Sequence, residues 1–164
     1  MTKFFLGIAI VAFTSFCGYF LAKKFRQRKL FFAQFWEFNE RFLSEIAYYR
    51  RPLREFIFKY SYKDEFAFLL EEYVVFLKER FMDDRMFLDN PAFSFLKQEE
   101  KGVVSDYFLM LGKGDSASQK GYFTAVKETL KKLQTESEIA CKRYGDLYIK
   151  LGFLCGLLIL ILIV

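Results

Sequence analysis

The stretch FFLGIAIVAFTSFCGYFLA, residues 4–22, followed at once by KKFRQRK, residues 23–29, decides how this chain is organised. The first stretch carries no charge, and as a helix it would span about 28 Å, close to the hydrocarbon thickness of a bilayer. A cleaved signal peptide is the alternative, but the stretch Gly18-Tyr19-Phe20-Leu21-Ala22 lacks a small-x-small cleavage site. We therefore predict a retained N-terminal transmembrane anchor over residues 1–22.

The segment 23–29 is a basic juxtamembrane segment that orients this anchor. One lysine, Lys3, precedes the apolar stretch, whereas five basic residues and no acid follow it. Positive charge is retained on the cytoplasmic side of a membrane, so the N-terminus is expected outside and the following residues inside. The residues predicted to orient the protein are Lys23, Lys24, Arg26, Arg28, Lys29 and, at the other end of the chain, Lys150.

The C-terminal end is also apolar. Its last 14 residues, LGFLCGLLILILIV at 151–164, carry no charge and would span about 21 Å as a helix. That is short, but snorkelling of the Lys150 side chain could bring Leu147 to Ile149 into the interface. We predict a C-terminal membrane helix over 147–164, and whether it fully crosses the bilayer stays open. Both anchors would leave the same face of the membrane, with residues 30–146 between them as a cytoplasmic domain.

Charge and cysteine usage exclude several classes of protein. The net charge is +5, yet residues 30–150 hold 19 basic and 20 acidic residues, so the excess lies at the membrane boundary and predicts no nucleic-acid groove. The chain has three cysteines in no metal-binding spacing and no histidine. Neither a disulfide framework nor a metal site is predicted, and no cofactor is expected.

The central residues read as an all-α domain, because Pro and Gly are few and apolar residues recur at helical spacing. Asp64 is the expected N-cap of a central helix, and residues 82–90 are expected to form a loop. The expected helices cover 31 to the residue before Pro52, continuing from the first membrane helix, then 52–60, 64–81, 91–100, 103–111, and a last one from Asp115 or Ser116 onward.

The last expected helix has the most regular pattern. Apolar or small residues alternate steps of three and four from Phe123 to Leu154, which favours lengthwise packing against one long helix. Its continuation past Lys150 predicts that it enters the membrane unbroken. Gly145 and Gly152 lie within it, each as a hinge, a close helix contact or a tolerated glycine.

No pattern points to catalysis. Gly112-x-Gly114 lacks the GK[ST] ending of a phosphate loop and reads as a turn between helices. The adjacent acidic pairs do not share a helix face, and the serines have no histidine to activate them.

Four aromatic residues crowd the short second helix and its exit, and any that stays exposed would mark a partner-binding patch. They are Phe56, Phe58, Tyr60 and Tyr62.

Four motifs in order between the two anchors resemble the stage III sporulation protein AB family. Glu45-Ile46-x-Tyr48 with Pro52-Leu53-x-Glu55 is similar to its EIxYG-x-TPLxEA stretch. Leu111-Gly112, Asp115 and Gln119 resemble its LGxSDxxxQ turn, and Gly114 in place of Ser moves the expected cap to Asp115. The first anchor with its basic residues and the segment around Gly152 resemble the family's two ends. The residues carried over as structural or interaction residues are Glu45, Ile46, Tyr48, Pro52, Leu53, Glu55, Gly112, Asp115, Gln119 and Gly152.

The resemblance implies a compact bundle of about six helices, similar to the cytoplasmic domains of type II secretion platform proteins. It also implies a subunit of a secretion-like channel complex linking mother cell and forespore. The protein would lie in the outer forespore membrane, its central domain in the mother-cell cytoplasm. Its expected partners are a secretion-type ATPase and other membrane subunits, and self-association is left open. The alternatives are a membrane-tethered enzyme, which needs a polar pocket with perturbed acids, and a small pore-former, which the large charged domain disfavours.

Overall fold

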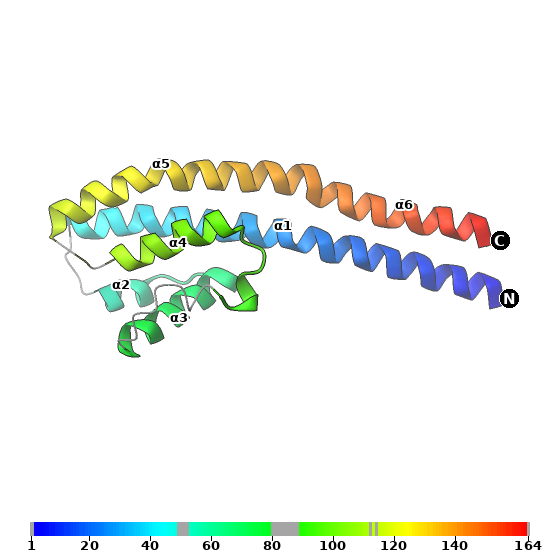
Figure 1. Cartoon of the computed structure of the whole chain (residues 1–164), viewed down its shortest axis with the longest axis horizontal. Coiled ribbons are helices and arrows are strands. Elements are labelled where there is room, and N and C mark those ends of the chain that lie inside the picture. The colour runs from blue at the N-terminus through cyan, green and yellow to red at the C-terminus, as the bar shows by residue number, and fades with distance from the viewer. Residues whose placement is uncertain (1, 49–52, 80–88, 112, 114, 164) are drawn as a thin grey trace. The chain divides into compact units, whose positions relative to one another are not determined.

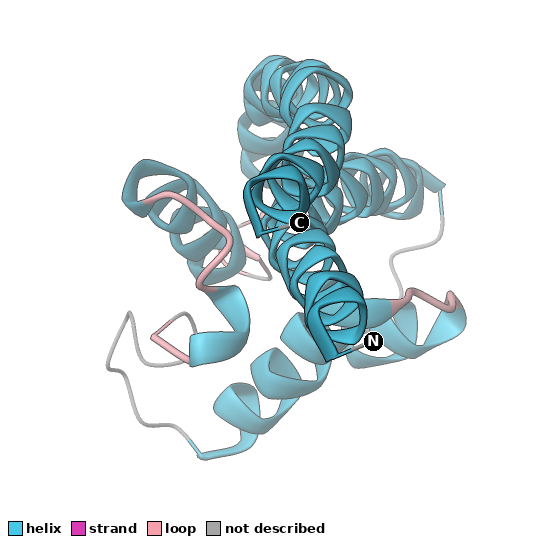
Figure 2. Cartoon of the chain, turned by 90° about the vertical axis from the view of Figure 1, so that its right-hand side faces the viewer, coloured by secondary structure: helices cyan, strands magenta, loops and turns pink. Residues whose placement is uncertain are grey.

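The computed structural model describes residues 2–48, 53–79, 89–111, 113 and 115–163, and every regular element among them is helical (Figures 1 and 2). The last three elements follow one another without a break, so the described residues form five helices. The all-α prediction is confirmed, whereas the count of about six is not. In chain order the elements are α1 (Thr2–Tyr48), α2 (Leu53–Lys59), α3 (Asp64–Glu79), a 3₁₀ turn (Pro91–Phe93), α4 (Gln98–Met110), α5 (Ser116–Ala140), a π-helical turn (Cys141–Gly145) and α6 (Asp146–Ile163).

Two compact units make up the chain. The terminal unit comprises Met1–Lys29 and Thr135–Val164, and the central unit comprises Leu30–Gln134. Helix α1 contributes to both, because it is 47 residues long and continues past the first apolar stretch, as predicted. α1 and the run from α5 to α6 each contain an apolar window long enough to cross a membrane, and 11% of each window is buried. The described residues therefore include two candidate membrane-spanning helices, one toward each end of the chain.

In the terminal unit the start of α1 and helix α6 run antiparallel, with both chain ends at the same end of the unit (Figure 1). Their backbones approach closely at small residues. A Cβ atom added to Gly152 would lie 2.7 Å from the carbonyl oxygen of Thr14 and 3.1 Å from the Cα of Gly18. Gly156 likewise faces Val11, whose Cα would lie 2.9 Å from an added Cβ. Helix pairs in membranes favour such small residues, because packing and not apolar burial holds them together.

The face that α6 turns inward differs from the prediction. The three- and four-residue steps place Tyr144, Leu147, Leu151 and Leu154 inside, yet all four side chains are exposed. The buried or half-buried residues are instead Gly145, Tyr148, Gly152 and Gly156. The reason is the π-helical turn Cys141–Gly145, which accommodates one extra residue and so rotates all later residues by about 100°. The predicted unbroken helix is correct as a path of the chain but wrong in its register.

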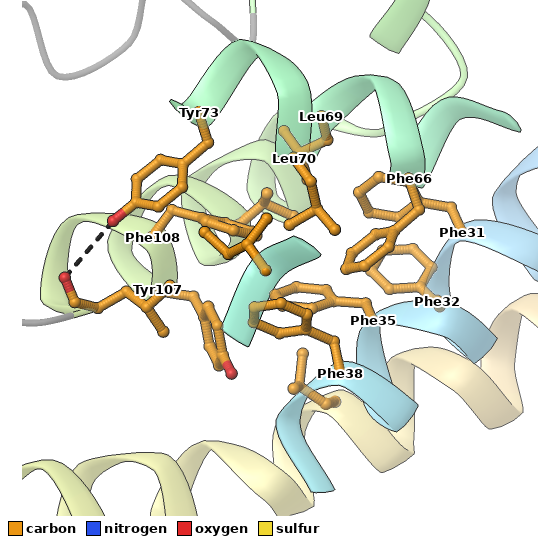
Figure 3. Close-up of a cluster of buried hydrophobic side chains, with 14 of the residues drawn as sticks. Phe31, Phe32, Phe35, Phe38, Phe66, Leu69, Leu70, Tyr73, Tyr107 and Phe108 are labelled. Carbon is orange, nitrogen blue, oxygen red and sulfur yellow. Dashed lines mark hydrogen bonds between the residues drawn. The ribbon is translucent and has the colours of Figure 1, made fainter. Parts of the chain in front are cut away.

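The core of the central unit is aromatic (Figure 3). Phe31, Phe35, Phe38 and Phe42 of α1 are at most 5% exposed, as their spacing predicted. Their rings meet those of α3, α4 and α5 edge to face, with centroids 4.8 Å apart for Phe35–Tyr107 and 4.9 Å for Phe42–Phe123. Aromatic pairs of this kind contribute about 0.5–1.5 kcal/mol each beyond their buried area. This stripe of α1 is therefore the centre of the bundle.

Between residues 91 and 111 the structure has one helix where the sequence predicted two. Asn90 caps only a 3₁₀ turn at Pro91–Phe93, accepting a hydrogen bond from the Ala92 N–H at 2.9 Å. Phe93, in this turn, is buried together with Phe95 and Leu96, which follow it outside regular helix. Phe93 and Phe95 are two residues apart and would not share one face of an α-helix. Helix α4 begins at Gln98, where the Glu100 carboxylate accepts from the Lys97 N–H at 3.0 Å.

Asp64 lies at the expected helix start but in an unexpected conformation. It is the first residue of α3 and has a φ of 52°. This is the left-handed region, which Asp tolerates better than most residues with a side chain. The expected loop at 82–90 falls mainly outside the described residues, of which only Asp89 and Asn90 belong to it.

Candidate functional site

The first family motif brings together α1 and α2. Glu45, near the end of α1, is 4% exposed, and its Oε2 accepts a hydrogen bond from Lys59 Nζ of α2 at 3.1 Å. The hydrogen bonds with Tyr60 and Glu45 raise the pKa of Lys59, which is consistent with a charged pair. A buried carboxylate requires such a partner, because leaving it unpaired is costly. The ion pair therefore fixes where α2 lies on α1.

Tyr60 and Tyr62, which follow α2, pack against the guanidinium group of Arg41 on α1. The guanidinium carbon of Arg41 lies 4.3 Å from the centroid of the Tyr60 ring and 5.4 Å from that of the Tyr62 ring. Arg41 also donates a hydrogen bond to the Tyr62 hydroxyl at 3.4 Å. Burial raises the pKa of Tyr62, although the nearby Arg41 opposes the shift. Cation–π contacts of this kind order the segment between α2 and α3.

An open cavity of about 370 Å³ lies between α2 and the start of α3. We call it the α2–α3 groove, and its lining residues are Ile57–Tyr62, Ala67, Leu70 and Glu71. Of the four aromatic residues singled out above, Phe56 is buried in the core, Tyr60 and Tyr62 are half-buried, and Phe58 is 62% exposed. An exposed phenylalanine in the lining of a groove is a candidate contact for another protein.

The second family motif shapes the start of α5. Asp115 directly precedes the helix, and its Oδ1 accepts a hydrogen bond from the Ser118 N–H at 3.3 Å. Hydrogen bonds from Ser118 hold the pKa of the Asp115 carboxyl below its usual value. Gln119 donates through its side-chain amide to the Lys113 carbonyl oxygen at 3.1 Å. Of the two caps that the sequence allowed, the structure thus has Asp115 at the cap position and Ser116 as the first residue of the helix.

The other predicted residues are spread over the chain. Ile46 and Leu53 pack against the core, and Glu55 is exposed in the first turn of α2, where it suits the helix dipole. Tyr48 ends α1, while Pro52 and Gly112 lie outside the described residues. Gly152 belongs to the close contact in the terminal unit. The basic residues Lys23, Lys24, Arg26 and Lys150 are exposed, Lys29 is half-buried, and Arg28 is 7% exposed.

The structure also places a polar group that sequence reasoning missed. Asn39 is fully buried, accepts a hydrogen bond from the Tyr107 hydroxyl at 3.0 Å and donates one to the Phe123 carbonyl oxygen at 3.3 Å. Its position four residues after Phe35 and three before Phe42 places it on the apolar face of α1. An amide in the middle of that stripe was the available signal.

Several acidic side chains of the central unit have structural partners. Glu40 pairs with Lys127 at 2.9 Å, as Glu45 does with Lys59, and Asp115 caps a helix. Within the described residues no group of three or more potential metal-ligating side chains is present. The geometry can thus hold helices together and offer a contact surface.

The fold defines a class of protein, namely a helical domain combined with two candidate membrane-spanning helices. More specifically, the family model for stage III sporulation protein AB matches residues 3–164, and the chain belongs to that family. The resemblance drawn from the sequence motifs is thereby confirmed. No curated protein and no solved structure matches the chain.

Proposed function

We propose that this chain is a non-enzymatic platform subunit of a secretion-like channel complex that links mother cell and forespore during endospore formation. It would couple a cytoplasmic ATPase to the membrane subunits of the complex. The observation that carries the proposal is the family match over residues 3–164. The two candidate membrane-spanning helices support a membrane location.

The proposed orientation follows from charge. Five basic residues follow the apolar start of α1 and one precedes it, which favours an external N-terminus. The antiparallel pairing of α1 and α6 in the terminal unit agrees with two crossings in opposite directions. The central unit would then face the mother-cell cytoplasm from the outer forespore membrane, where an ATPase can reach it.

The absence of an enzymatic role is part of the proposal. It is supported by the use of Glu40, Glu45 and Asp115 in ion pairs and a helix cap. The α2–α3 groove, whose lining includes the exposed Phe58, is the surface that we propose for contact with another subunit. Exposed aromatic residues are common anchors of such contacts.

The test is deletion of the gene in its native endospore-forming host, with counts of heat-resistant spores and membrane-stained imaging of the forespore. We expect normal vegetative growth and arrest after engulfment, rescued by the intact gene. A version lacking residues 151–164 should not rescue. A matched version with Gly152 and Gly156 replaced by Leu keeps an apolar segment of the same length, and it separates anchoring from close helix packing. Unchanged spore counts in the deletion strain would overturn the proposal.

A further inference from the structure

A small cavity lies within the terminal unit, beside the basic end of its α1 segment. Tyr19, Ala22, Lys23 and Arg26 line one wall, and these residues share one face of α1. Cys141, Gly145, Asp146 and Ile149 form the other wall. The cavity has a volume of about 50 Å³, room for several water molecules or a group the size of a phosphate.

The π-helical turn contributes two of the four residues of the second wall. Its first and last residues, Cys141 and Gly145, both line the cavity, and Gly145 is buried. A Cβ atom at Gly145 would lie 3.8 Å from Cys141 Sγ, so the glycine is not required by crowding inside the turn. π-helical turns are rare and occur frequently at functional sites. An irregular turn of the helix thus lies directly at this cavity.

Charge surrounds this cavity asymmetrically. The segments 23–29 and 141–150 together hold eight basic residues and one acidic residue, Asp146. Lys23 and Arg26 line the cavity and their side chains are exposed. With Asp146 as the one acid of the lining, the cavity keeps an excess of positive charge. That excess is complementary to a group carrying one negative charge.

Apolar surface begins directly beside these charges. Tyr19, Phe20, Leu147 and Ile149 are all exposed, by 39–57%. A ligand that satisfies both surfaces needs an anionic head and apolar chains, which describes an acidic phospholipid. Basic pockets between membrane helices on the cytoplasmic side bind such headgroups.

We propose that this cavity binds the headgroup phosphate of an anionic phospholipid, with Lys23 and Arg26 contacting the phosphate and Tyr19 and Ile149 contacting the start of the acyl chains. The site goes beyond the channel function proposed above and requires only that the terminal unit lies in a bilayer. Asp146 limits its affinity, because it is an acidic residue in the lining of the same cavity. The protein would thereby hold one acidic lipid at the boundary of its membrane segments.

The test uses Cys141 as a reporter in the full-length chain, with Cys17 and Cys155 replaced by Ser. The chain is placed in nanodiscs of phosphatidylcholine, with or without phosphatidylglycerol, and the rate of Cys141 alkylation by a neutral maleimide is measured. Phosphatidylglycerol should slow alkylation. The fraction of phosphatidylglycerol that gives half of the full protection should rise roughly tenfold or more in Lys23→Gln with Arg26→Gln. The reason is that each basic residue near the membrane adds to the attraction for anionic lipid. Asp146→Asn should shift that fraction downward.

The matched control is Lys24→Gln with Lys29→Gln, which removes the same charge from the same helix without touching the lining. This variant should keep the protection. Equal loss in the two double variants would show a diffuse surface effect and overturn the site. Equal alkylation rates in both lipids would overturn it as well. Protection by inorganic phosphate in lipid-free detergent, equal to that by phosphatidylglycerol, would assign the cavity to a soluble anion and also refute the proposal. Far-UV circular dichroism verifies that each variant is folded.

Discussion

Asn39 shows how one polar side chain specifies the packing of an aromatic core. Rings of Phe and Tyr can pack in several arrangements of similar energy, whereas a hydrogen bond has one geometry. The Tyr107 hydroxyl donates to Asn39, which links α4 to α1, and Asn39 donates to Phe123, which links α1 to α5. Because an unpaired polar group is costly in such a core, the packing arrangement that forms both hydrogen bonds of Asn39 is favoured.

Replacement of Asn39 by Ala should lower the free energy of unfolding by about 1–3 kcal/mol, since the Tyr107 hydroxyl would lose its acceptor while fully buried. Urea unfolding of the full-length chain in detergent, followed by circular dichroism, measures the loss. The double variant Asn39→Ala with Tyr107→Phe should be less destabilised than the sum of the single variants. Additive effects would show that the two residues do not form a unit.

Phe56 and Phe58 lie two residues apart on α2 and have opposite environments, at 1% and 62% exposure. We expect Phe56→Ala to cost about 3–5 kcal/mol of stability through a core cavity. Phe58→Ala should change stability by no more than about 0.5 kcal/mol, because its side chain makes few core contacts. Spore counts after complementation should nevertheless fall with Phe58→Ala. Full sporulation by that variant would remove the α2–α3 groove as a partner surface.

At the scale of elements, glycines have different roles according to what lies against them. An added Cβ at Gly152 meets the backbone of α1, whereas one at Gly121 in α5 meets nothing within 4 Å. The same substitution therefore has opposite consequences in two helices of one chain. In an open helix position alanine is the better residue, because it restricts the unfolded chain.

Gly152→Ala should destabilise the chain by about 1–3 kcal/mol, since the two helices of the terminal unit would have to separate. Gly121→Ala should stabilise it by about 0.5–1 kcal/mol. Thermal unfolding in detergent micelles, with both variants measured beside the parent chain, checks the two signs together. A neutral effect at Gly152 would contradict the close contact with Thr14 and Gly18.

The π-helical turn can be tested by deletion. It represents one residue more than an α-helix needs, so removing Arg143 should restore regular helix while leaving Ser137 and Gly152 on their present faces. Removing Thr129 instead shifts every later residue of α5 by about 100° and should displace Leu130 from the core. We expect the first deletion to retain a thermal midpoint close to that of the parent and the second to lower it strongly. The reverse order would show that the extra residue is required for folding.

Considered as a whole molecule, the chain divides its apolar residues between two purposes. In the central unit they form a buried aromatic core, whereas in the terminal unit large apolar side chains such as Phe13, Phe16 and Leu162 are exposed. Aromatic burial in the central unit includes tyrosines, and burial raises the pKa values of Tyr62, Tyr73, Tyr107 and Tyr122. The stability of this unit should therefore depend on alkaline pH.

The sign follows from proton binding. Above about pH 10 the tyrosines of the unfolded chain lose their protons, while those of the folded chain keep them. The stabilisation is present in full below pH 10 and is lost as the pH rises further, so the urea midpoint should fall only above that value. Tyr73→Phe keeps the ring and removes one titrating group, and it should make the fall shallower. A midpoint independent of pH across this range would contradict the burial of these hydroxyls.

Sequence patterns predicted much of this protein because they arise from local geometry. The uncharged run ending at Ala22 and the spacing from Phe31 to Phe42 follow from the rise and period of a helix, which neighbouring residues set by themselves. Asp115 at the start of α5 is local too, since a cap bonds residues three positions away. The family motifs added the placement of the chain among sporulation proteins.

The sequence by itself thus determined the helices whose residue spacing is locally regular, the two apolar ends, the basic boundary at 23–29 and the family. Only the tertiary structure decided the face of α6, the turn that replaces a helix at residues 91–97, the burial of Asn39 and the exposure of Phe58. These depend on contacts between residues far apart in the chain, such as Gly18 with Gly152 and Asn39 with Phe123. A local period cannot indicate which partner a residue meets, because one extra residue in a π-helical turn changes the face without changing the composition.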